Sequence, residues 1–196
     1  GATVNVMSKF DPALFLKTIQ AHKITILHIV PPIVLFLAKH PLVDQFDLSS
    51  VHTIVCGAAP RGEELASAVV KRLKLTNLLQ GYGMTELSPV THISPQGNKK
   101  YGAAGILVAN TEALLVDVDT EKPVTQLGTE HRGEIWIRGP QVMKGYLNNA
   151  EATKHTVDKD GWLHTGDIAY MDEEGYFFVV DRLKELIKYK GFQVPP

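Results

Sequence analysis

Hydrophobic and polar residues follow two different rhythms along the chain, and the first hundred residues show the pattern of an α/β domain. Short apolar runs that suit buried strands alternate with segments whose apolar residues recur at helical spacing. Asp11 followed by Pro12 is a strong helix start, an N-cap with proline at the first helical position. We expect strands at residues 24–30, 53–56 and 75–80, and helices from Asp11, at 33–39 and at 62–74. This alternation predicts a mostly parallel sheet covered by helices.

The pattern changes near residues 95–97, and strand patterns dominate from Tyr101 onward. Residues 173–175 have the length and composition of a hairpin loop. The strands are expected at residues 113–118, 133–138, 168–171 and 176–180, and one helix at 150–157 interrupts them. The second half therefore predicts a smaller antiparallel β-rich subdomain packed on the first. The fold class is α/β with this addition.

Composition and charge exclude several classes of protein. Of the 196 residues, 44% are hydrophobic and 21% are charged, which is ordinary for a globular protein. The net charge of −1 gives no basis for binding nucleic acid. Cys56 is the only cysteine, so no internal disulfide can form. The most apolar window, residues 24–37, is broken by His28 and two prolines and falls short of a transmembrane segment.

Residues 81–86, which read Gly-Tyr-Gly-Met-Thr-Glu, combine the features that a nucleotide site needs. The glycines let a backbone approach a ligand closely, and Tyr82 offers a flat face to a base. Thr85 has a hydroxyl for a phosphate oxygen, and Glu86 is a hard oxygen ligand that suits Mg²⁺. The motif follows an apolar run, and open α/β sheets bind ligands at the carboxyl ends of strands. Taken alone, it could equally be a glycine-rich turn that ends a strand.

This motif belongs to one of four separated blocks along the chain, which begin at Cys56, Gln80, Gly133 and Gly161. They read Cys-Gly-Ala-Ala-Pro; Gln-Gly-Tyr-Gly-Met-Thr-Glu; Gly-Glu-Ile with a later Gly-Pro-Gln-Val-Met-Lys-Gly-Tyr; and Gly-Trp-Leu-His-Thr-Gly-Asp, closed by Asp-Arg-Leu-Lys-Glu-Leu-Ile-Lys-Tyr-Lys-Gly. On these residues the chain resembles the adenylate-forming superfamily of acyl-CoA synthetases, 4-coumarate-CoA ligases and beetle-type luciferases. The resemblance implies an internal piece of a longer protein. Residues 1–100 would form its α/β subdomain, 101–182 its β-rich subdomain, and 183–196 a hinge with the start of a C-terminal domain.

The resemblance implies an ATP-dependent acid–CoA ligase. A small aromatic or fatty carboxylic acid would be joined to AMP with loss of pyrophosphate, and CoA would then displace AMP. ATP, Mg²⁺ and CoA are therefore the expected cofactors, and the cytoplasm or the peroxisome the expected compartment. Two alternatives stay open: a luciferase-like monooxygenase that shares the adenylation step, and a non-catalytic nucleotide-binding fragment. By itself, the chain is expected not to turn over ATP.

The matched blocks also imply roles for individual residues. Asp167 would hold the ribose diol, with Arg182 near the same ribose. Thr85 would contact the α-phosphate, Glu86 would bind Mg²⁺, and Lys188 would face the acyl-adenylate. Further nucleotide contacts are expected from Gln80, Gly81, Tyr82 and Lys184, the last of which is also the hinge. The acyl pocket is expected at Gly57, Ala58, Ala59, Gly83, Pro89 and Val90, and CoA contacts at Lys190, Gly191 and Gln193.

Each of these roles has a structural alternative. Asp167 could lie in an ordinary turn, and Tyr82 could belong to the core. Arg182 could form a surface ion pair with Asp181 or Glu185. The small residues after Cys56 could form a tight strand-to-helix turn.

Overall fold

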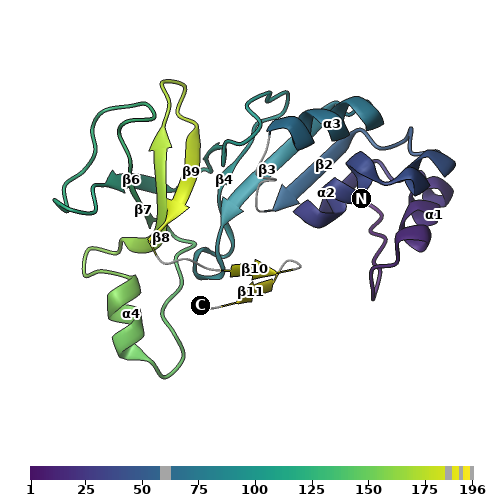
Figure 1. The fold of residues 1–196 in the computed structure, drawn as a ribbon. Coiled ribbons are helices and arrows are strands. Elements are labelled where there is room, and N and C mark those ends of the chain that lie inside the picture. The colour runs from purple at the N-terminus through teal and green to yellow at the C-terminus, as the bar shows by residue number, and fades with distance from the viewer. Residues whose placement is uncertain (58–62, 184–186, 190–191, 195–196) are drawn as a thin grey trace.

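The computed structural model describes residues 1–57, 63–183, 187–189 and 192–194. The helices are α1 (Pro12–His22), α2 (Pro31–Lys39), α3 (Glu63–Leu73) and α4 (Ala150–Thr156), with 3-10 turns η1 (Pro41–Gln45) and η2 (Thr85–Leu87). The strands are β1 (Ile26–Ile29), β2 (Thr53–Gly57), β3 (Asn77–Gly83), β4 (Val90–Ile93), β5 (Ile106–Leu107), β6 (Glu112–Val116), β7 (Gly133–Arg138), β8 (Leu163–Met171), β9 (Phe177–Arg182), β10 (Ile187–Tyr189) and β11 (Phe192–Val194). Figure 1 shows a helix-covered sheet beside a second, β-rich part.

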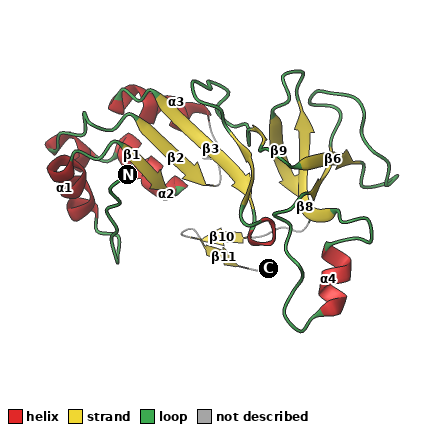
Figure 2. Cartoon of the chain, turned by 180° about the vertical axis from the view of Figure 1, so that it is seen from behind, coloured by secondary structure: helices red, strands yellow, loops and turns green. Residues whose placement is uncertain are grey.

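The first sheet has the order β1-β2-β3-β4-β5, and its β1, β2 and β3 are parallel. Leu27, Ile54 and Leu78 are register partners across these strands and lie buried on one face. That face packs in one core with apolar residues of α1, α2 and α3. The sequence prediction of a mostly parallel sheet with flanking helices is confirmed (Figure 2).

The helix starts follow the capping signals in the sequence. The Asp11 carboxylate accepts a hydrogen bond from the Leu14 backbone N–H at 2.7 Å, so α1 has a side-chain N-cap followed by Pro12. The second helix begins at Pro31, two residues earlier than predicted. A proline in the first helical turn costs no hydrogen bond, since the first N–H groups of a helix have no partner within it.

The second sheet is antiparallel throughout, in the order β6-β7-β8-β9. Residues of β7 and β8 alternate between buried and partly exposed, so one face of each strand enters a separate core. That core contains Leu87, Ala104, Leu115, Ile135, Ile137, Leu163, Ala169 and Phe177. The predicted antiparallel β-rich part and its loop at residues 173–175 are confirmed.

Two strands extend three or more residues beyond a predicted end. The third strand runs on from Gln80 to Gly83, because Gly81 and Tyr82 pair antiparallel with residues of β4, a strand that the pattern did not indicate. The eighth begins at Leu163 and not at Ile168. As a result residues 81–83 of the glycine motif and Asp167 lie within strands, and a turn at Asp167 is excluded.

Contacts between the two sheets gather around Lys100 and Phe177. The Lys100 ammonium lies 2.5 Å from Asp172 Oδ2 and 2.9 Å from Glu174 Oε1, and it sits 4.6 Å from the centre of the Tyr176 ring. The ring of Phe177 packs 4.5 Å from that of His92, centre to centre. The turn between β8 and β9 is thereby fixed to the first sheet.

In the part of the chain that the structure describes, none of the helices has the length and apolar character of a transmembrane segment.

Candidate functional site

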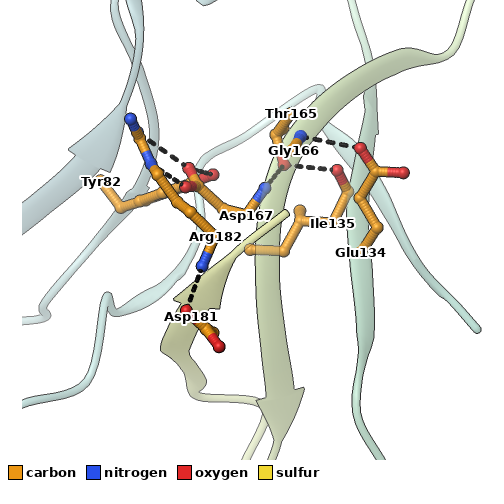
Figure 3. Close-up of polar contacts among 8 residues, drawn as sticks. All are labelled: Tyr82, Glu134, Ile135, Thr165, Gly166, Asp167, Asp181 and Arg182. Atoms are coloured by element: carbon orange, nitrogen blue, oxygen red, sulfur yellow. Dashed lines mark hydrogen bonds and ion pairs between the residues drawn. The ribbon is translucent and has the colours of Figure 1, made fainter. Parts of the chain in front are cut away.

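Asp167, Arg182 and Tyr82 meet where the two sheets face each other (Figure 3). Asp167 of β8 and Arg182 of β9 are register partners, and Tyr82 comes from the end of β3. The Arg182 guanidinium donates from Nε to Asp167 Oδ1, and from Nη2 to Oδ2 at 3.4 Å. The Tyr82 hydroxyl donates to the same Oδ2 at 2.8 Å. Asp167 is only 2% exposed, so this carboxylate is enclosed by its donors.

The charges of this cluster are balanced internally. Burial raises the pKa of Tyr82 far above its ordinary value, and the neighbouring Asp167 carboxylate raises it further. Tyr82 therefore remains a neutral donor at all physiological pH values. Arg182 supplies the positive charge that a buried carboxylate needs. Among the described residues, Arg182 forms its ion pair with Asp167, and Asp181 accepts the backbone N–H of Arg182 at 2.8 Å. The alternative partner Glu185 lies outside the described residues.

Thr85 and Glu86 lie on η2, just after the glycine motif. Thr85 is exposed and Glu86 is half-buried. The Tyr146 hydroxyl donates to Glu86 Oε1 at 2.7 Å, and the backbone N–H of Met143 donates to the Glu86 carbonyl at 2.8 Å. Tyr146 was missed at the sequence level, although it closes the third matched block. No local spacing connects it with a residue 60 positions away.

Glu86 belongs to no cluster of three or more metal-ligating side chains in the described ranges. No group of three or more His, Cys, Asp or Glu residues there could hold a metal ion by itself. Magnesium, however, is commonly bound through one or two carboxylates, with phosphate oxygens and waters completing the octahedron. Glu86 fits a metal that arrives with a phosphate ligand.

The three glycines around this site have different structural reasons. A Cβ at Gly83 would lie 1.7 Å from the Pro89 carbonyl oxygen, so Gly83 is required by the close approach of the segment leading into β4. Gly57 and Gly81 are register partners in β2 and β3. A Cβ at Gly57 would meet nothing within 4 Å, and one at Gly81 would make only ordinary contacts. These two glycines leave a bare strip of backbone at the carboxyl ends of parallel strands, beside the exposed Val90.

Gln80 is 2% exposed, and both of its side-chain polar atoms are buried without a hydrogen-bond partner among the described residues. Its register partner Cys56 is fully buried, so a nucleotide over the bare strip could reach Gln80 only through its backbone. His92 was not predicted as part of the site, yet its ring lies 5.4 Å from that of Tyr82, centre to centre. Burial lowers the pKa of His92 to about 4.

Several predicted residues cannot be placed. Ala58, Ala59, Lys184, Lys190 and Gly191 lie outside the described residues. Lys188 and Gln193 are register partners in the hairpin of β10 and β11, where the backbone alone is described. The acyl and CoA assignments that depend on these side chains stay predictions.

The fold and the site define a class of protein: an α/β sheet with a glycine motif at the ends of parallel strands, in contact with a buried aspartate that is paired with an arginine on a second sheet. The family of AMP-binding enzymes matches residues 1–147. The chain belongs to that family.

Relatives match over the whole length of this chain. It is 54% identical over 201 residues to 4-coumarate–CoA ligase 1 of Solanum tuberosum, covering 100% of this chain and 36% of that protein. It is 50% identical over 196 residues to luciferin 4-monooxygenase of Photinus pyralis, covering 100% and 35%. The structure of ATP-bound MatB from Rhodopseudomonas palustris superposes with a TM-score of 0.80 at 29% identity, covering 97% of this chain and 37% of that one. The chain thus spans little more than a third of the length of these relatives.

Proposed function

We propose that this chain is the nucleoside-binding part of an ATP-dependent acid–CoA ligase of the 4-coumarate-CoA ligase type. The observation that carries the proposal is the buried Asp167 carboxylate, which is paired with the partly exposed Arg182 and bonded to Tyr82 of the glycine motif. The 54% identity to 4-coumarate–CoA ligase 1 of Solanum tuberosum supports this type of ligase. The substrate would be a small aromatic or fatty carboxylic acid, and the compartment the cytoplasm or the peroxisome.

The chemistry explains why such an enzyme needs this pair. A free carboxylate is a poor acyl donor, and joining it to AMP gives it a good leaving group. Asp167 accepts charge-assisted hydrogen bonds, which suits the diol of a ribose. Its Oδ2 is already bonded to Tyr82, so the ribose hydroxyls would take the place of the tyrosine hydroxyl. The released Tyr82 ring would then offer its face to adenine, beside the bare strip at Gly57 and Gly81.

The phosphates would extend from this ribose toward η2. Thr85 has an exposed hydroxyl there for the α-phosphate, and Glu86 has a carboxylate for Mg²⁺. Mg²⁺, when bound, neutralises phosphate charge and so stabilises the displacement of pyrophosphate. Lys188 would face the acyl-adenylate, and Lys190, Gly191 and Gln193 would contact CoA after rotation about Lys184.

A luciferase-like monooxygenase is the second candidate, favoured by 50% identity to luciferin 4-monooxygenase. Both reactions begin with the same adenylation, so the residues described above serve either one. The two diverge afterwards: a ligase requires CoA and forms a thioester, whereas a monooxygenase consumes oxygen. Thioester formation from an acyl-adenylate without oxygen uptake would select the ligase.

The test uses the complete reading frame that contains these residues. We expect ATP-dependent release of pyrophosphate with at least one member of a panel of aromatic and fatty acids, followed by CoA-dependent thioester formation. Asp167→Asn should abolish most of this release, whereas Asp181→Asn, which changes the exposed neighbouring carboxylate of β9, should leave it near the parent level. Equal activity in both variants would refute the ribose assignment. The 196-residue chain by itself is expected to release no pyrophosphate above background.

A further inference from the structure

The segment that carries Asp167 leaves the regular ladder of its sheet. Glu134 of β7 pairs with Ile168 of β8, but Trp136 pairs with His164. Two steps along β7 therefore correspond to four along β8, and a second register shift follows between β8 and β9, after Ile168. Bulges of this kind bend a strand and re-aim its side chains, and they are frequent beside active sites.

Side chains satisfy the backbone groups that the bulge removes from the ladder. Glu134 Oε1 accepts the Gly166 N–H at 2.7 Å (Figure 3). The Thr165 hydroxyl donates to the Ile135 carbonyl at 2.7 Å and accepts the Asp167 N–H at 3.1 Å. Gly166 adopts a φ of +71°, a left-handed conformation that favours glycine. The Gly166 peptide is thus held in an unusual conformation by a carboxylate from the neighbouring strand.

The Glu134 carboxylate is itself oriented. Its Oε2 accepts the indole N–H of Trp136 at 2.7 Å. The Trp136 ring stacks on His164, with 3.9 Å between ring centres and 10° between planes. Glu134 therefore has one oxygen fixed by Trp136 and the other directed at Gly166, and neither oxygen contacts Asp167 or Arg182.

Gly166 also contacts the segment that carries Arg182, through its other peptide group, the one it shares with Asp167. The Gly166 carbonyl accepts the backbone N–H of Leu183 at 2.8 Å. Gly166 immediately precedes Asp167, and Leu183 immediately follows Arg182. A shift of the Gly166 peptide would consequently move the two members of the ion pair relative to each other.

We propose that Glu134 is a positioning residue, which sets the place of Asp167 against Arg182 through the Gly166 peptide. For nucleotide binding the proposal rests on the proposed function, because it assumes that the Asp167–Arg182 pair receives the ribose. Glu134 would act on the affinity for ATP and leave the affinity for the acid unchanged.

The test compares Glu134→Gln with Glu112→Gln, a matched change on β6 where the carboxylate is bonded to Arg138. Glutamine has one acceptor oxygen and one amide donor group, so it can satisfy Gly166 or Trp136 but not both. In the 196-residue chain, NMR would record amide exchange at Gly166 and the Nε–H signal of Arg182. In the complete protein, kinetics would record KM for ATP and for the acid.

For Glu134→Gln we expect exchange at Gly166 to become about 10-fold faster or more, the Arg182 signal to shift, and KM for ATP to rise about 10-fold. KM for the acid and all readouts of Glu112→Gln should stay near the parent values. Trp136→Phe, which removes only the donor to Oε2, should give the same changes at smaller size and serves if Glu134→Gln does not fold.

Unchanged exchange at Gly166, or faster exchange with an unmoved Arg182 signal, would overturn the positioning role. Faster exchange and a shifted Arg182 signal with an unchanged KM for ATP would overturn its use in nucleotide binding. If the complete parent protein releases no pyrophosphate with any acid, the proposed function fails. The two NMR readouts still decide the role of Glu134 in that case.

Discussion

The two carboxylates of the site, Asp167 and Glu86, are held in opposite ways. Asp167 is 2% exposed and receives three donors, two from Arg182 and one from Tyr82. Glu86 is half-buried on a single 3-10 turn and receives the hydroxyl of Tyr146. A carboxylate offers about four lone-pair positions. Asp167 is therefore nearly saturated, whereas Glu86 keeps most of its positions open.

This difference separates two strategies of ligand binding. At Asp167 the donors are already in place, so the ribose of the proposed function would have to exchange with a group that is already bonded. At Glu86 the open positions suit a metal ion that brings its own phosphate and water ligands. The nucleoside end is thus specified by the fold, and the phosphate end by the ligands that arrive.

The largest effect on stability is expected from removing the Asp167 carboxylate. Asp167→Ala leaves Arg182 and the Tyr82 hydroxyl without their acceptor, and breaking a buried ion pair typically costs about 3–5 kcal/mol of stability. We expect a loss near the lower value, because the Arg182 side chain is 26% exposed and can be rehydrated. Urea unfolding of the chain would measure it, with Asp181→Ala as the control. A loss of stability no larger than that of the control would contradict the interpretation that Asp167 forms an enclosed ion pair.

Acid should lower the stability of the folded protein through His92, whose ring lies beside that of Tyr82. The pKa of His92 is about 4 in the folded protein because of burial, against an ordinary value of 6.5. Between these values the unfolded chain binds one more proton than the folded one, so stability falls as the pH falls through this range. The total loss is about 3 kcal/mol, at 1.36 kcal/mol per pKa unit.

Unfolding free energies of the parent and of His92→Gln, measured from pH 7 to pH 4, would test this prediction. Other groups titrate in both proteins, so their contributions cancel in the difference. The curve of the parent should be steeper. Parallel curves would show that His92 is accessible to protons in the folded state.

Removing the Tyr146 hydroxyl should weaken the binding of Mg²⁺ at Glu86. Partners that orient a metal-ligating carboxylate typically contribute 10- to 100-fold in metal affinity. For Tyr146→Phe in the complete protein we expect about a 10-fold rise in the Mg²⁺ concentration that gives half-maximal pyrophosphate release. Tyr170→Phe is the control, since that ring stacks on Phe178 at 4.8 Å. An equal effect of both changes would remove Tyr146 from the metal site.

The smallest effect is expected from the Tyr82 hydroxyl. Tyr82→Phe keeps the ring and frees Asp167 Oδ2, so KM for ATP should fall by about 2- to 5-fold, while stability drops by about 1 kcal/mol. Steady-state kinetics and urea unfolding of this variant would record both. A 10-fold rise in KM would mean that the hydroxyl itself binds the nucleotide.

Much of the fold was predictable because its signals are local. Apolar runs and helical spacing located the elements around the first core, and the cap at Asp11 located the start of α1. The strand β4 was missed, and β3 was ended too early, because their antiparallel pairing depends on residues brought together by the chain as a whole. Periodicity within a short window contains no information about such pairing.

The candidate site was likewise predictable only in part. The motif at residues 81–86 indicated Glu86 as a functional residue, and the resemblance indicated Asp167 and Arg182. Neither indicated their partners, because the contacts of Tyr82 with Asp167, Tyr146 with Glu86 and Glu134 with Gly166 span 85, 60 and 32 positions. A hydrogen bond between side chains so far apart leaves no repeating pattern in the sequence.

The Lys100 contacts have a mechanical consequence. They hold the turn of the β8–β9 hairpin through Asp172 and Glu174, while the Tyr82 hydroxyl holds the opposite end at Asp167. A beam supported at both ends bends far less under the same load than a cantilever fixed at one. The hairpin is held at both ends in this way, in addition to its pairing with β7. Asp167 and Arg182 lie at one of the held ends, so we expect their spacing to change little when the hairpin bends.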